Sequence, residues 1–146
     1  MQTIGRKDRI DLPELKLFDI EAKIDTGAYG NALHCHHFEV ILKEGKKYLS
    51  FKVLDPDHPE YEDLEFLVEH YRIKKVKSSS GEAELRYTIK TEIIIFHKSR
   101  IIEFSLTDRK NMKYPILLGR KFLTKRFLVD VRQKDLSFHE KKSQSN

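Results

Sequence analysis

The sequence predicts an all-β protein, folded as a small closed barrel or sandwich in one domain over residues 1–139. Apolar residues recur at every second position in several short runs, which is typical of strands that bury one face. Polar or Gly-containing connections separate these runs. There is no long amphipathic helical pattern and no internal repeat, and a chain of 146 residues is large enough to bury its own core.

The first long strand is expected over residues 15–24. Its apolar positions alternate up to Ile24, and Asp25 follows directly. Gly27 lies two residues after Asp25, in a segment whose residue types favour turns. Asp25 is therefore expected at the point where a strand gives way to a turn.

Short connections between strand-like runs predict three antiparallel pairs. The connection at residues 43–46 contains Gly45, and the connection at residues 97–99 is short and polar, as hairpins require. The expected pairs are residues 38–42 with 48–53, residues 84–96 with 100–106, and residues 127–129 with 136–138. This succession of antiparallel strands favours a closed or nearly closed β-structure.

Three other segments are expected outside regular structure. Residues 55–63 are acidic and interrupted by proline, so they predict a surface loop. Residues 77–82 are small and polar and lie between two strand-like runs, which predicts a mobile hairpin tip. Residues 140–146 are expected to form a frayed tail of basic and polar residues.

Composition excludes several classes of protein. With 39% apolar and 35% charged residues, the chain has too many large apolar side chains for a disordered protein. No apolar run approaches the ~20 residues that cross a bilayer, and the N-terminal residues do not resemble a signal peptide. We therefore expect a cytoplasmic protein without a membrane segment. The single cysteine, Cys35, excludes an internal disulfide.

The net charge of +5 is concentrated near the C-terminus. Residues 1–107 hold 17 Lys and Arg against 19 Asp and Glu, whereas residues 108–146 hold 11 against 4. A basic end of this kind can contact nucleic acid or an acidic partner. The charges are scattered among apolar residues and no RNA- or DNA-binding motif accompanies them. The pattern therefore favours a solvated surface, and nucleic-acid binding is not expected.

Two distant segments together indicate a chemistry. The expected strand at residues 22–24 runs into Asp-Thr-Gly-Ala at residues 25–28, and Leu-Leu-Gly-Arg follows far downstream at residues 117–120. Asp-Thr-Gly alone is also an ordinary turn sequence. The pairing of an Asp-Thr-Gly loop with a later apolar-apolar-Gly-Arg segment resembles the retropepsin pattern of aspartic peptidases.

The resemblance covers nearly the whole chain. It is to a bacterial and archaeal retropepsin-like family that carries the label ATP-dependent zinc protease and is often associated with RimK-type ligases. The segments that carry it are Ile4-Gly5-Arg6, Leu12-Pro13, residues 22–28, Leu106-Thr107-Asp108-Arg109, residues 117–120 and Phe127-Leu128-Val129-Asp130. The sequence contains neither His-Glu-x-x-His nor Gly-x-x-x-x-Gly-Lys-Ser/Thr. We therefore expect no metal and no cofactor.

The resemblance implies a fold and an activity. The fold is an acid-protease barrel with one short helix near residues 119–123, and the activity is hydrolysis of a peptide or protein substrate with Asp25 as the catalytic residue. Aspartic peptidases need two carboxylates that share one proton, because like charges so close together cannot both ionise. One chain supplies one such carboxylate, so a homodimer that brings Asp25 against its symmetry mate is expected.

The resemblance also implies roles for neighbouring residues. The hydroxyl of Thr26 would hold the two catalytic loops together across the interface, Gly27 would leave the backbone open to an extended peptide, and Ala28 would line the cleft. The segment Ser78, Ser79, Ser80 and Gly81 would form the flap that closes over the substrate. Leu118, Gly119 and Arg120 would form the second structural motif. Viral relatives pair the equivalent Arg with an acid after the catalytic motif, but Tyr29 and Gly30 stand there in this chain, so Arg120 must have another partner.

The cluster His34-Cys35-His36-His37 consists of residue types that commonly bind transition metals. In a strand, successive side chains point to opposite faces and no second cluster supplies further ligands, so surface or partly packed histidines beside a small apolar cysteine are favoured. A nucleophilic role for Cys35 would need an oriented base, which adjacency in sequence does not provide. Asp108, Arg109 and Asp130 are interpreted as structural.

Two other functions stay open on the sequence alone. A peptide-binding or regulatory module could keep the same fold without catalysis. A binder of nucleic acid or an acidic partner could use the basic region at residues 109–142. The association of the family with RimK-type ligases implies a link to glutamate-modified proteins or peptides.

Overall fold

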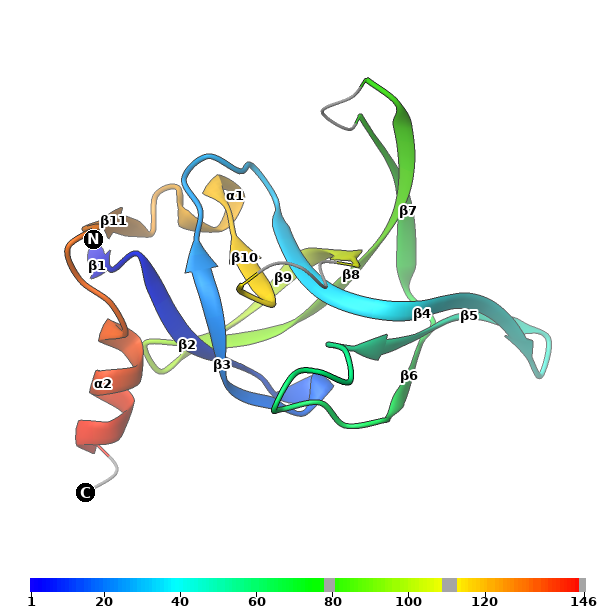
Figure 1. The fold of residues 1–146 in the computed structure, drawn as a ribbon, viewed down its shortest axis with the longest axis horizontal. Coiled ribbons are helices and arrows are strands. Elements are labelled where there is room, and N and C mark those ends of the chain that lie inside the picture. The colour runs from blue at the N-terminus through cyan, green and yellow to red at the C-terminus, as the bar shows by residue number, and fades with distance from the viewer. Residues whose placement is uncertain (78–80, 109–112, 145–146) are drawn as a thin grey trace.

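The structure, a computed structural model, describes residues 1–77, 81–108 and 113–144. Strands dominate these ranges, which confirms the all-β prediction (Figure 1). The elements in chain order are β1 Gln2–Ile4, β2 Lys7–Leu12, the 3₁₀ turn η1 Pro13–Leu15, β3 Leu17–Ile24, β4 Asn31–Lys43, β5 Lys46–Val53, β6 Glu65–Val68, β7 Tyr71–Lys77, β8 Ala83–Ile95, β9 Lys98–Thr107, β10 Ile116–Leu118, α1 Arg120–Leu123, β11 Phe127–Val129 and α2 Leu136–Gln144.

A closed ring of strands forms the body of the molecule. Neighbouring strands pair in the order β10, β3, β2, β8, β9 and β4, and β10 pairs with β4 to complete the ring. The short β10 therefore lies between β3 and β4, with Leu118 beside Ile24 and Leu117 beside Ala32. The alternating apolar residues of these strands form the core, whose fully buried side chains include Ile10, Ile20, Leu33, Ile93, Phe104 and Phe122.

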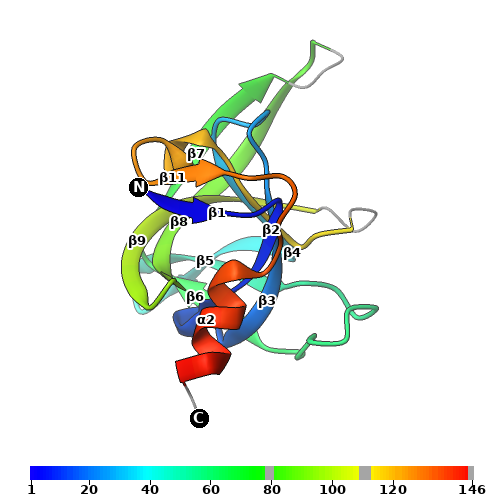
Figure 2. The same ribbon diagram turned by 90° about the vertical axis from the view of Figure 1, so that its left-hand side faces the viewer.

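Two extensions leave the ring. The long strand β4 continues past it to pair with β5, and β5 pairs with β6. Strand β7 pairs with the first half of β8, and this β7–β8 hairpin projects from the body (Figures 1 and 2). The loop between β3 and β4, which contains Asp25, lies toward the same end of the molecule as the hairpin in both views.

Two of the three predicted hairpins are confirmed. Strands β4 and β5 pair antiparallel across Glu44 and Gly45, and strands β8 and β9 pair across Phe96 and His97. Both turns have positive φ at both central residues, with φ of 51° and 78° in the first and 50° and 60° in the second. This conformation matches the right-handed twist of the flanking strands. The short helix predicted near residues 119–123 is also present, as α1.

The third predicted hairpin is wrong, and residues 140–144 of the predicted frayed tail are helical. Strand β11 pairs in parallel with β1, and residues 136–144 form helix α2 (Figure 2). Three alternating residues fit a short strand and a helical turn equally well, so the pattern at residues 136–138 could not distinguish them. Lys141 holds the helix to the barrel through ion pairs of 2.9 Å with Asp11 and 2.7 Å with Asp19. Within the ranges described, none of the helices has the length and apolarity to span a bilayer.

Helix α2 begins on a buried carboxylate from β2. The Asp8 side chain is fully buried, and it accepts backbone N–H bonds of 2.9 Å from Ser137 and 3.1 Å from Phe138. These N–H groups belong to the first turn of the helix and have no partner within it. A residue distant in sequence therefore caps the helix.

Replacement of Asp8 by alanine is expected to lower the free energy of unfolding by about 2 kcal/mol, because two buried N–H groups lose their acceptor. Urea denaturation followed by circular dichroism measures this change. The Asp8→Asn variant keeps one acceptor oxygen and should recover part of the loss. Equal stability of Asp8→Ala and the unchanged protein would contradict the proposed capping.

Candidate active site

Asp25 stands at the end of β3, where the sequence pattern places it. Its backbone N–H donates a 2.9 Å bond to the carbonyl of Leu118, which continues the pairing of β3 with β10 by one residue. Its carbonyl accepts a 3.3 Å bond from the N–H of Ala28, which closes a turn. The carboxylate is half-buried, and its Oδ1 accepts a 3.0 Å bond from the N–H of Gly27. The loop thus fixes one oxygen of the acid.

The segment that begins at Gly119 is hydrogen-bonded to this loop. The backbone N–H of Arg120 donates to the carbonyl of Ala28 at 2.9 Å, and that of Lys121 donates to Tyr29 at 2.8 Å. Both donors lie in the first turn of α1, where backbone N–H groups need external acceptors. The two segments that the sequence analysis paired are therefore in direct contact.

Gly119 allows this contact to be close. A Cβ at this position would lie 2.3 Å from the carbonyl oxygen of Gly30, 2.7 Å from that of Tyr29 and 2.8 Å from that of Ala28. All three atoms are backbone, so they cannot move aside as a flexible side chain could. The glycine is required here by space, since its φ of −98° is open to any residue.

Within the described residues, the Arg120 side chain contacts two groups, neither of which is an acid. Its Nη1 donates a 3.1 Å bond to the carbonyl of Thr26, and its guanidinium lies 5.9 Å from the centre of the Tyr29 ring. Tyr29 thus replaces the acid that follows the motif in viral relatives, with a cation–π contact in place of an ion pair. The partner that the sequence left open is the Asp25 loop itself.

Asn31 is a site residue that the sequence analysis missed. Its side chain is buried, accepts a 3.0 Å bond from the N–H of Gly119 and donates a 3.0 Å bond to the carbonyl of Glu103. It therefore joins the start of β4, the α1 segment and β9. The only signal in the sequence is a polar residue that directly precedes the apolar run of β4.

The remaining predicted site residues belong to two segments, the Asp25 loop and the end of the β7–β8 hairpin. Thr26 and Gly27 are exposed and Ala28 is half-buried, and a Cβ at Gly27 would lie 3.3 Å from Oδ1 of Asp25. Gly81 is exposed with a φ of 85° at the end of the β7–β8 hairpin. The other predicted flap residues, Ser78, Ser79 and Ser80, lie outside the described residues.

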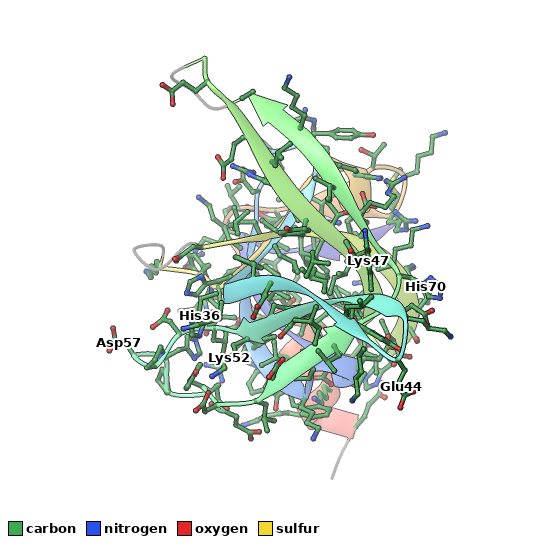
Figure 3. All side chains as sticks on the ribbon, turned by 90° about the vertical axis from the view of Figure 1, so that its right-hand side faces the viewer. His36, Glu44, Lys47, Lys52, Asp57 and His70 are labelled. Atoms are coloured by element: carbon green, nitrogen blue, oxygen red, sulfur yellow. The ribbon has the colours of Figure 1, made fainter. Side chains whose placement is uncertain are left out.

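The histidine cluster divides between two environments. His34 is buried, and its Nε2 lies 2.6 Å from Oδ2 of Asp55, so the expectation of a surface or partly packed residue is wrong for His34. Cys35 is also buried, and burial raises the pKa of its thiol well above the usual value. The ring of His36 lies 5.7 Å from that of Tyr61, on the face shown in Figure 3. The described residues contain no group of three or more His, Cys, Asp or Glu that could hold a metal ion.

Comparisons with known proteins agree with this geometry. A family model described as "Retropepsin-like aspartic endopeptidase RimB" matches residues 3–140. A "Probable alpha-L-glutamate ligase" from Parasynechococcus marenigrum is 31% identical over 131 residues, which are 87% of this chain and 27% of that protein. A protein of the same name from Desulfotalea psychrophila is 32% identical over the same fractions of the two chains. The chain therefore spans about a quarter of the length of these curated relatives, 27% in both cases.

A solved structure resembles the chain over most of its length. It is a crystal structure of a Legionella pneumophila protein of unknown function (DUF785), with a TM-score of 0.73 and 30% identity. The match covers 93% of this chain and 98% of that one. Together with the family model, which extends over both the Asp25 loop and the Gly119 segment, it shows that the chain belongs to the RimB-like family of retropepsin-like aspartic endopeptidases.

Proposed function

We propose that the chain is one subunit of an aspartic endopeptidase that hydrolyses peptide bonds with Asp25 from each of two copies. The observation that carries this proposal is the setting of Asp25. A half-buried carboxylate stands on an exposed loop, one of its oxygens is fixed by the N–H of Gly27, and the segment at Gly119 supports the loop. This arrangement holds an acid in place while leaving one side open to a substrate.

The reaction follows from two such acids facing each other. The ionised carboxylate takes a proton from a water molecule, whose oxygen attacks the peptide carbonyl carbon. The protonated carboxyl gives its proton to the carbonyl oxygen, which forms a neutral tetrahedral intermediate. Collapse of the intermediate breaks the C–N bond. The proton taken from water passes to the leaving nitrogen, and one hydroxyl group of the intermediate returns its proton to the other carboxylate as the carbonyl re-forms. The products are a carboxylic acid and an amine, and the pair returns to its singly protonated state.

The exposure of the Asp25 loop supports a site completed by a second copy. Thr26 and Tyr29 are exposed beside the catalytic residue, where a symmetry mate would meet them. A two-fold axis at this loop would make an isologous interface and would place both acids at its centre.

The β7–β8 hairpin would supply the flap. It projects from the body at the end of the molecule where the Asp25 loop lies (Figures 1 and 2). A hairpin over an extended peptide can add backbone hydrogen bonds as a neighbouring strand does. Ser78, Ser79, Ser80 and Gly81 are proposed as its closing tip, with Gly27 and Ala28 beneath the substrate.

We also propose a link to glutamate-modified proteins or peptides in the cytoplasm. The support is that curated relatives which contain a matching segment are named as α-L-glutamate ligases.

The dependence of activity on protein concentration tests the dimer. We expect the rate of peptide cleavage per chain to rise with concentration and to level off once sedimentation velocity shows that the dimer is complete. A constant rate per chain down to concentrations at which only monomers sediment would contradict a shared site. Peptide binding without cleavage at any concentration between mildly acid and neutral pH would instead indicate a binding or regulatory module.

A further inference from the structure

One largely buried carboxylate adds a side-chain link between the base of the β7–β8 hairpin and strand β9, with which β8 also pairs. Oε2 of Glu103, on β9, accepts a 2.8 Å bond from Nη2 of Arg72, and Oε1 accepts a bond from Nζ of Lys74. Both cations lie on β7. The Glu103 side chain is only 10% exposed, whereas those of Arg72 and Lys74 are 63% and 41% exposed. The acid is therefore the enclosed centre of this ion-pair cluster.

The same carboxylate also reaches helix α1. Nζ of Lys121 lies 3.6 Å from Oε1 of Glu103, and the carbonyl of Glu103 accepts a 3.0 Å bond from the side chain of Asn31. Asn31 in turn accepts a 3.0 Å bond from the N–H of Gly119. Lys121 also donates its own N–H to the carbonyl of Tyr29 in the catalytic loop at 2.8 Å. Contacts thus run without a break from the hairpin base to the support of Asp25.

The charge of Glu103 is present throughout the pH range of interest. Burial alone would raise its pKa, but Lys74, Lys121 and Arg72 outweigh burial and lower the pKa from its usual 4.5 to about 2. A folded-state pKa below the unfolded value means that the ionised contacts stabilise the fold above the unfolded pKa and are lost as the pH falls through about 2. The cluster therefore stays intact in mildly acid and neutral solution.

We propose that Glu103 is a positioning residue, which fixes the base of the β7–β8 hairpin against the support of the Asp25 loop. The role follows from its place in the fold. Strand β7 pairs only with β8 among the described strands, and the contacts of Glu103 give β7 a further link to β9 and, through Lys121, to α1. A flap whose base is already fixed loses less conformational entropy when a peptide binds. A larger part of the free energy of its contacts therefore contributes to affinity. This inference rests on the proposed peptidase function.

The test compares Glu103→Gln with Glu92→Gln in the 146-residue protein. Glu92 lies on β8 beyond the part that pairs with β7, and its carboxylate accepts a hydrogen bond from Ser99 of β9. In Glu103→Gln we expect hydrogen exchange of the β7 amides to accelerate about tenfold while exchange in β2 and β4 stays unchanged. We expect KM for a peptide to rise about fivefold with kcat within about twofold of the unchanged protein. Glu92→Gln should leave both measurements within about twofold.

A second variant controls for a folding defect in Glu103→Gln. The double change Arg72→Gln with Lys74→Gln removes the exposed partners instead of the enclosed acid, and it should reproduce both effects. Adding Glu103→Gln to it should then cause little further change, because the three side chains act as one unit. The ratio of kcat/KM between the unchanged protein and Glu103→Gln should also stay constant from mildly acid to neutral pH.

The outcomes separate this proposal from the function on which it rests. Unchanged β7 exchange in Glu103→Gln, or acceleration that is equal in all strands, would overturn the positioning role. A rise in exchange with an unchanged KM would overturn its effect on substrate binding. If the unchanged protein cleaves no peptide at any pH, the peptidase function fails, and the exchange measurements still decide whether Glu103 holds the hairpin.

Discussion

Replacement of Asp25 by asparagine is expected to lower kcat for peptide hydrolysis by at least about a thousandfold. In the dimer this substitution removes both acids at once. An amide can neither take a proton from the attacking water nor give one to the carbonyl oxygen as a carboxyl group does. Asparagine has nearly the same shape, and its Oδ1 can still accept the 3.0 Å bond from the N–H of Gly27. Loss of activity should therefore come without loss of structure, with thermal unfolding within a few degrees of the unchanged protein.

The matched control is Asp57→Asn. Asp57 is exposed in the loop between β5 and β6, and Figure 3 shows its side chain at the outer edge of the molecule. The same change of charge there should leave kcat and KM within about twofold. Equal activity of Asp25→Asn and the unchanged protein would end the peptidase proposal, because no other acid is placed in this loop.

Mixed dimers distinguish a shared site from two separate ones. When equal amounts of the unchanged protein and Asp25→Asn are mixed and allowed to exchange subunits, about half of the unchanged chains enter mixed dimers. Each mixed dimer would have only one acid. We expect the cleavage rate per unchanged chain to fall by about half, whereas independent sites would leave that rate the same.

The parts of the fold that the sequence predicted are those with local signals. The alternation from Leu15 to Ile24 placed Asp25 at a strand end because side chains on a strand repeat with a period of two. The turns at Gly45 and His97 were recognisable because short polar connections join antiparallel strands. The contact between Asp25 and Leu118 was expected from the resemblance, since no local pattern pairs two strands that lie so far apart in sequence.

The parts that it missed depend on tertiary contacts. Helix α2 begins on Asp8, a residue at the other end of the chain, so its cap left no trace in the neighbouring sequence. Glu103 looks like any outward-facing charge of a half-buried strand, and only the fold brings Arg72 and Lys121 around it. His34 is likewise buried, because the loop after β5 brings Asp55 into contact with it. Polar residues whose partners are distant in sequence cannot be told from solvated ones by pattern alone.

Replacement of Gly119 by alanine is expected to lower the free energy of unfolding by about 3 kcal/mol and kcat by about a hundredfold. The added methyl group would sit 2.3 Å from the carbonyl oxygen of Gly30 and 2.7 Å from that of Tyr29. Relief of these contacts requires the catalytic loop and α1 to separate. That movement weakens the bond from Arg120 to Ala28 and would shift Asp25 relative to the second acid of the proposed dimer. Urea denaturation and peptide cleavage measure the two effects.

Gly30→Ala provides the comparison within the same contact. A Cβ at Gly30 would meet nothing within 4 Å, so the free energy of unfolding should change by less than about 1 kcal/mol. The two substitutions add the same methyl group to neighbouring backbone segments, and they differ in whether that group points into the junction between the loop and α1. A large loss in both variants would mean that the loop depends on glycine flexibility. A large loss in Gly119→Ala alone would assign the effect to the close approach that holds Asp25 in place.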